Sequence, residues 1–93
     1  PQKPPPPPPQ QQQQQQEMIE HAAQRVLREA SNLLESYEKA EKSHRLGRHR
    51  ATLMRTSKII SQQCRNLMKY RHHLTPALYN RISKTMNQIS RLF

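Results

Sequence analysis

Acidic residues are missing from more than half of this sequence. The 93 residues include no Asp, and the six Glu all lie between positions 17 and 41, so residues 42–93 carry no acidic side chain. The same segment carries twelve Lys or Arg and four His, and the whole chain has a formal net charge of +10. Charge of one sign repels itself, so this segment is expected to bind a polyanion or an acidic partner.

Residue types that build catalytic and metal sites are also scarce. A single Gly cannot form a phosphate-cradling loop, and a single Cys, Cys64, excludes an internal disulfide framework. Cys64 and His72 would lie about 12 Å apart along a helix, and nothing supplies a third group to orient the imidazole. The scattered His show no zinc-ligand spacing. We therefore expect a protein that is not an enzyme and has no metal, cofactor or small-molecule substrate, with Cys64 buried beside Ile60 and Leu67.

Apolar residues make up only 32% of the chain, against roughly 45–50% in globular proteins. This allows one small domain with a thin core, so a partner protein or a second copy is expected to add stability. No apolar run approaches the ~20 residues that cross a bilayer, and a membrane is not expected as the partner. Without an initiator Met or a signal-peptide pattern, the chain is interpreted as a fragment of a longer intracellular protein.

Residues 1–16 are of low complexity, with an unbroken run of proline at Pro4–Pro9 and one of glutamine at Gln10–Gln16. The proline run favours polyproline II, and its spacing after Lys3 is one that SH3-type grooves accept, as any proline homopolymer does. We predict a disordered arm over residues 1–16. Glutamine is a fair helix former, so the end of its run can extend the helix that follows.

The strongest helical pattern runs from residue 17 to about residue 46. Its apolar residues alternate in spacings of four and three, which is a heptad seam; they are Ile19, Ala23, Val26, Ala30, Leu33, Tyr37 and Ala40. Three pairs at the favourable i, i+4 spacing support the helix: Glu35–Lys39, Glu38–Lys42 and Glu41–Arg45. Gly47, the only glycine, is predicted to follow the helix cap.

A second helix is predicted over residues 49–73. Leu53, Ile60, Leu67 and Leu74 recur every seven residues, and the alternate seam positions are assigned to Thr56, Gln63 and Tyr70. Because half of this seam is polar, the helix should depend on its neighbours. No good N-cap residue precedes it, so it could also continue the first helix through Gly47; we expect a break.

A third helix is predicted over residues 76–92. Thr75 is a good N-cap and Pro76 suits the first helical position. Leu78, Ile82, Met86 and Ile89 then form an apolar face. The expected fold is all-α: a helical hairpin plus a third helix, packed as a small, coiled-coil-like bundle in one domain of residues 17–93.

Basic residues line the exposed face of the second helix in two adjacent rows. Cations in a row can follow phosphates and release counterions at each contact. The candidate nucleic-acid contacts are Arg45, Arg48, Arg50, Arg55, Lys58, Arg65, Lys69 and Arg71. A solvated helix face is the alternative, although a face chosen for solubility usually mixes both signs. No motif for reading bases is present.

The sequence leaves three functions open. The first is a helical interaction module, pairing with a protein partner or with itself through Ile19, Val26, Leu33, Tyr37, Leu53, Ile60, Leu67, Leu78, Ile82, Met86 and Ile89. Proline- and glutamine-rich tracts beside helices are typical of transcription and chromatin subunits, which favours a nuclear setting. The second is direct, sequence-nonspecific DNA or RNA binding through the second helix. The third is a basic amphipathic third helix that binds an anionic membrane or a calmodulin-like groove.

Overall fold

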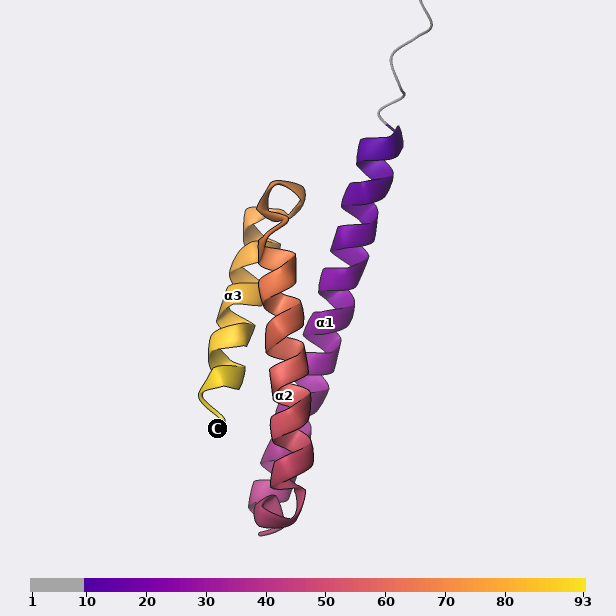
Figure 1. Cartoon of the computed structure of the whole chain (residues 1–93). Helices are drawn as coiled ribbons and strands as arrows, with labels where there is room; N and C mark the ends of the chain where they lie inside the picture. Colours follow the sequence, from indigo (N-terminus) through magenta and orange to yellow (C-terminus); the bar gives the residue numbers. More distant parts are fainter. Residues whose placement is uncertain (1–9) are drawn as a thin grey trace, which may run out of the picture.

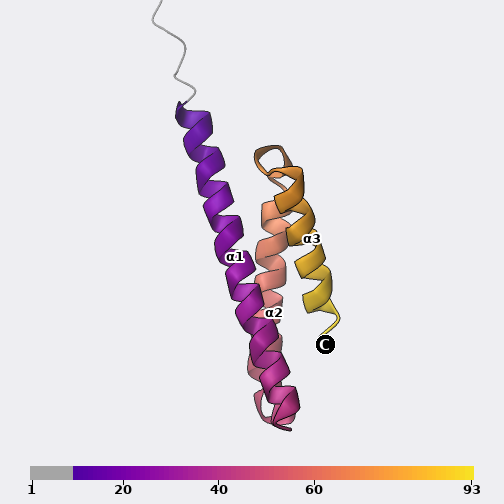
Figure 2. The same cartoon turned by 180° about the vertical axis from the view of Figure 1, so that it is seen from behind.

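Three α-helices form the frame of the molecule, which a computed structural model describes over residues 10–93. They are α1 (Gln10–Lys42), α2 (Leu46–Met68) and α3 (Pro76–Ser90), with a short 3-10 helix, η1 (Arg71–His73), between the last two. α2 runs back along α1, and α3 lies beside α2 (Figures 1 and 2). The all-α bundle is therefore confirmed, with no strand anywhere in residues 10–93. The predicted arm falls largely on residues 1–9, outside the described part.

α1 is 33 residues long and begins in the glutamine run, at Gln10 rather than near Glu17. Glutamine has a helix propensity close to that of Lys and Glu, so a helix already held by its apolar stripe extends into this run at little cost. The first turn of α1 contains no acidic residue. In a helix beginning near residue 17, Glu17 and Glu20 would be expected to lie at the positive end of the helix dipole; in α1 they lie too far along the helix to interact with it.

The turn between α1 and α2 does not use Gly47 as predicted. His44 has the left-handed backbone conformation instead, with φ of 59°. The Arg45 N–H donates to the Ala40 carbonyl at 2.8 Å and the His44 N–H donates to the Glu41 carbonyl at 3.2 Å. These are the two bonds of a Schellman motif, with His44 in the position where Gly is usual. The two helices are therefore separate, as expected, but the break precedes Gly47.

Gly47→Ala is expected to stabilise the bundle. Gly47 lies in the first turn of α2 without a positive φ, and an added Cβ would meet no atom within 4 Å. Alanine should therefore add about 0.5–1 kcal/mol by restricting the unfolded chain and favouring the helix. Thermal unfolding followed by circular dichroism should show a rise of several degrees. A lower melting temperature would instead indicate that Gly47 has a left-handed backbone conformation, as the sequence suggested, because alanine is strained in that conformation.

The buried stripe of α2 differs from the predicted seam. Leu53, Ile60 and Leu67 are buried as expected, but the alternate positions belong to Ser57 and Cys64. The prediction for those positions was wrong: Thr56 and Tyr70 are exposed, and Gln63 is half-buried. Cysteine packs as a small hydrophobe, and the Ser57 hydroxyl donates to the Met54 carbonyl at 2.8 Å, which lets it be buried.

α3 begins as the sequence predicted. The Leu78 N–H donates to the Thr75 hydroxyl at 3.2 Å, and Pro76 occupies the first turn. Ile82 and Ile89 are fully buried, while Leu78 and Met86 are half-buried. The helix ends at Ser90, two residues earlier than expected. The cap and the apolar face together set which side of α3 meets α2.

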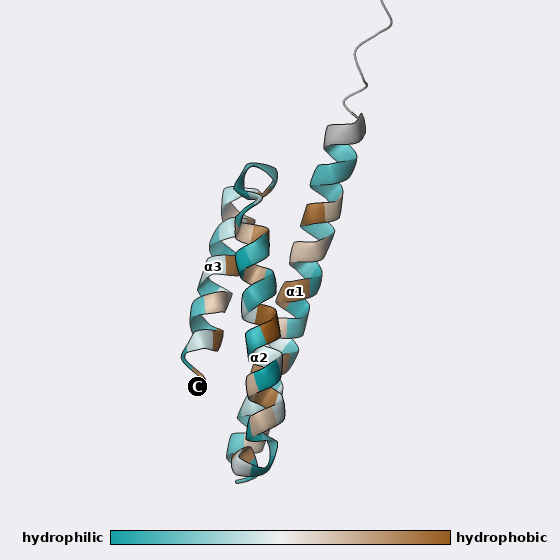
Figure 3. Cartoon of the chain, viewed as in Figure 1, coloured by the Kyte–Doolittle hydropathy of each residue, from teal (hydrophilic) through white to brown (hydrophobic). Residues whose placement is uncertain are grey.

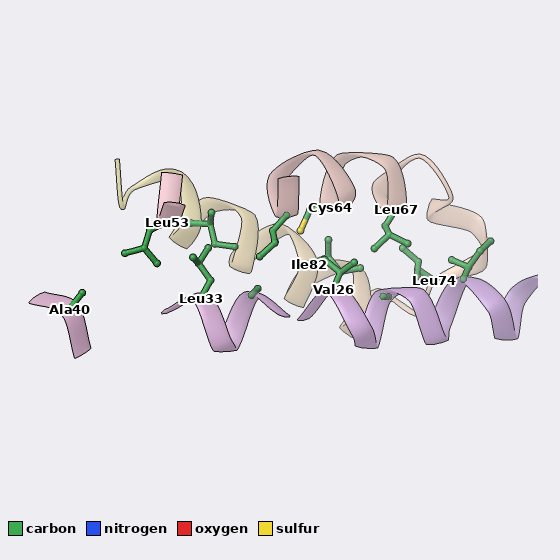
Figure 4. Packing of buried hydrophobic residues seen from close by; sticks show 13 residues of the cluster. Val26, Leu33, Ala40, Leu53, Cys64, Leu67, Leu74 and Ile82 are labelled. Atoms are coloured by element: carbon green, nitrogen blue, oxygen red, sulfur yellow. The ribbon is translucent and has the colours of Figure 1, made fainter. Parts of the chain in front are cut away.

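Buried side chains from all three helices form one core. The α1 stripe is buried as predicted, except that Tyr37 is half-buried; its hydroxyl donates to the Leu92 carbonyl at 3.4 Å. Figure 4 shows Val26 and Leu33 of α1 lying among Leu53, Cys64 and Leu67 of α2, with Ile82 of α3. Colouring by hydropathy shows polar residues over much of each helix (Figure 3). The core is thin, as the composition required.

Candidate nucleic-acid interface

All eight candidate basic residues are exposed. Five belong to α2, Arg45 precedes it, Lys69 follows it and Arg71 begins η1. The helix thus carries its cations on surface that neither α1 nor α3 covers. They are Arg45, Arg48, Arg50, Arg55, Lys58, Arg65, Lys69 and Arg71.

These cations are not neutralised within the described chain. In residues 10–93 one ion pair forms, between Glu38 and Lys42 at 2.9 Å, and both side chains are well exposed. The hydrogen bond from Lys42 and its positive charge lower the pKa of Glu38, and the same hydrogen bond and the negative charge of Glu38 raise the pKa of Lys42. The predicted pairs Glu35–Lys39 and Glu41–Arg45 do not reach ion-pair distance, the latter because α1 ends before Arg45.

Two of the eight cations are positioned by aromatic rings. The Arg50 guanidinium lies over the Phe93 ring, 5.9 Å from its centroid, and the Arg71 guanidinium lies 5.3 Å from that of Tyr79. Such contacts restrict the side chain while the N–H groups at the guanidinium edge stay able to bind an anion. Neither pair could be predicted from the sequence, because both join residues from different elements.

A groove of about 320 Å³ runs between α2 and α3 and includes two of the predicted cations, Lys58 and Arg65. The other lining residues were not predicted as site residues: Met54, Ser57, Ser61, Gln62, Ile89, Ser90 and Phe93. Both walls of the groove come from residues 42–93, which contain no Asp or Glu, so neither α2 nor α3 carries a carboxylate side chain. That absence was visible in the sequence, but the pairing of these two faces was not.

A second hollow, of about 380 Å³, lies at the hairpin end of α1 and α2. Ala40 and Leu53 are its apolar residues, and Lys39, Arg45 and His49 supply basic groups. Lys39 and His49 were missed as site residues, because Lys39 on α1 and His49 on α2 come to line one hollow only when the hairpin closes. An apolar floor with a basic rim suits an acidic amphipathic segment better than a bare phosphate.

The residues predicted to bind a protein partner lie in the chain's own core. Tyr37, Leu78 and Met86 are half-buried, and the other eight are buried: Ile19, Val26, Leu33, Leu53, Ile60, Leu67, Ile82 and Ile89. The large apolar side chains that are exposed are Met18, Ile59, Tyr70 and Phe93, of which Met18 is the most exposed at 73%. A partner that used the predicted residues would first have to open the bundle.

Cys64 is fully buried in the core, as expected, and burial raises the pKa of its thiol. The thiol is therefore protonated and shielded, which is unsuitable for a nucleophile. Residues 10–93 contain no group of three His, Cys, Asp or Glu placed to hold a metal ion. In the same residues, none of the helices has the length and hydrophobicity that a bilayer span requires.

The described residues form a packed helical bundle, which is compatible with an interaction module. The exposed charged side chains of α2 are all basic. No protein-family model, curated protein or solved structure matches the chain.

Proposed function

We propose that this protein is a non-enzymatic helical interaction module that binds nucleic acid, without sequence specificity, through the basic surface of α2. The observation that carries the proposal is that all eight predicted cations are exposed, while none of them pairs with a carboxylate in residues 10–93. Phosphates would supply the negative charge that the second half of the chain lacks. Each contact releases condensed counterions, and this release drives binding of basic surfaces to nucleic acid.

The arrangement favours phosphate contacts over base reading. The cations are spread along one exposed helix of the bundle, an arrangement that suits contacts with a run of phosphates. Contacts of this kind fix the position of a nucleic acid and carry no sequence information. The proline- and glutamine-rich start of the chain supports a nuclear setting, within a transcription or chromatin complex, as part of the proposal.

A second candidate function is binding of an acidic protein segment at the hairpin end. The hollow that carries it combines Ala40 and Leu53 with a rim of Lys39, Arg45 and His49. An amphipathic helix with acidic residues beside its apolar face would complement that pattern. This candidate keeps the bundle closed, because the buried residues that it uses, Ala40 and Leu53, already line the hollow in the folded bundle.

Salt titration of matched charge variants tests the first function. We expect the triple variant Lys58→Gln, Arg65→Gln, Lys69→Gln to bind duplex DNA with a salt slope lower by about 2–3, since each phosphate contact contributes about 0.9. The matched control is Arg25→Gln, Arg28→Gln, Lys39→Gln, which removes the same charge from α1. At physiological salt, screening over about 8 Å should leave the control close to the parent.

Fluorescence anisotropy with labelled DNA and RNA, repeated over a range of salt concentrations, gives the salt slope of each triple variant. Equal slopes for the two triple variants would show that net charge, not the α2 surface, determines binding. Absence of binding to every nucleic acid at roughly 50 mM salt would reject the proposed function. Binding of an acidic peptide that is weakened only by the α1 triple variant would favour the second candidate.

A further inference from the structure

The α2–α3 groove has the composition of a site for single-stranded nucleic acid. We infer that a single strand follows this groove, with its phosphates on Lys58 and Arg65 and a base stacked on Phe93. The inference rests on the proposed function and specifies which form of nucleic acid the protein binds and where. Proteins that bind single strands combine a basic groove that follows the backbone with aromatic rings on which bases stack.

The basic part of the groove lies on its α2 wall. Lys58 and Arg65 are seven residues apart, about 10 Å along the helix axis, and both are exposed. Ser61, between them, adds a hydroxyl group that can donate to a phosphate oxygen. Because every Glu of the chain lies on α1, neither wall contributes a carboxylate side chain that would repel the strand.

The aromatic part of the site is Phe93, which lines the groove and is 37% exposed. Tyr37 meets its ring edge to face, at 5.6 Å between centroids and 86° between planes. Arg50 lies over the ring and brings a third cation to the same site. The ring thus contacts Tyr37 of α1 and Arg50 of α2, and a base would stack on the part of the ring that these two side chains leave exposed.

The groove favours a single strand over a duplex for a geometric reason. In a duplex the base faces are already stacked on one another, so Phe93 cannot reach them, and only phosphates remain for contact. A single strand presents both its phosphates and its base faces, and can lie in a groove between two helices. The expected preference therefore arises from Phe93, while Lys58 and Arg65 serve both forms.

Phe93→Trp tests the stacking contact directly. The chain has no Trp, so the new indole is the only one and reports on this position alone. We expect its fluorescence to be quenched by an oligothymidylate of about twelve residues, within the site sizes of single-strand binders. A hairpin duplex with the same number of phosphates should leave it unquenched.

Affinity measurements on Phe93→Leu complete the test. Loss of the ring should weaken oligothymidylate binding about fivefold or more and leave duplex binding unchanged. Tyr70→Leu is the matched control, because Tyr70 is also an exposed aromatic residue but neither lines the groove nor lies under an arginine of residues 10–93. This control should bind both nucleic acids like the parent, and circular dichroism should confirm that every variant is folded.

The inference and the proposed function fail in different ways. Equal affinity of Phe93→Leu and the parent for the oligothymidylate, with an unquenched Phe93→Trp, would overturn the inference. The proposed function would still stand in that case if the salt slope of duplex binding were lower by about 2–3 in the triple variant of Lys58, Arg65 and Lys69. If the parent bound neither single-stranded nor duplex nucleic acid near 50 mM salt, both would fall.

Discussion

Ile60→Asp is expected to abolish the helical bundle, whereas Ile59→Asp is expected to leave it folded. The two isoleucines are neighbours on α2, but Ile60 is 1% exposed and Ile59 is 53% exposed. A carboxylate at position 60 would have to be buried without a partner, which costs several kcal/mol, or would have to force the helices apart. The whole stability of a small domain is about 5–15 kcal/mol, and a thin core places this chain near the lower end.

Circular dichroism and urea denaturation measure the difference between the two aspartate variants. Ile60→Asp should show little helix at room temperature, and Ile59→Asp should unfold at nearly the denaturant concentration of the parent. The comparison holds residue type, helix and added charge constant, so burial alone distinguishes the variants. Equal midpoints for both would mean that the described core is not the one that stabilises the protein.

Ala30→Leu is expected to destabilise the bundle by about 1–3 kcal/mol through overpacking. Ala30 and Ala23 are both 0% exposed in the stripe where α1 meets the rest of the core, and their small size sets how closely the helices approach. A leucine there adds three carbon atoms to a fully buried position, so side chains or backbone must shift. The melting temperature should fall by about 4–8 °C per kcal/mol in a domain of this size.

Ala51→Leu is the matched control for this prediction, because Ala51 is an exposed alanine inside α2. An exposed alanine to leucine change in a helix should alter stability by no more than about 0.5 kcal/mol. If Ala30→Leu were as stable as the control, the contact of α1 with the other helices would have to be looser than the structure shows. Thermal unfolding of both variants under the same buffer conditions provides the measurement.

The helices differed in how well the sequence predicted them, and the reason is the contrast between faces. In α1 the apolar residues from Ile19 to Ala40 stand out against charged and polar neighbours, so one stripe fits and it is the buried one. In α2 the stripes through Thr56 and through Ser57 are one residue apart and similarly polar. Contacts of α2 with both α1 and α3 select the stripe of Ser57; hydrogen bonding does not distinguish the two, because the Thr56 hydroxyl also donates to a carbonyl within the helix.

The turns also differed in how well the sequence predicted them. Thr75 and Pro76 are local signals, and the Thr75 hydroxyl caps α3 as its type predicts. Gly47 was assigned to the end of α1 because glycine tolerates a left-handed backbone, yet His44 has that conformation. The end of a helix depends on where its packing contacts stop as well as on the residue that can adopt the turn, and the sequence contains only the second kind of information.

The sequence by itself determined that the chain is helical, that its acids are confined to one helix, and that its second half presents unopposed positive charge, because residue type and spacing set propensity and charge directly. The tertiary structure alone decided which α2 residues are buried and that Lys58, Arg65 and Phe93 line one groove. It also decided that the predicted interface residues pack against one another inside a single chain. Those features depend on contacts between helices far apart in the sequence, and such contacts exist only after the bundle closes.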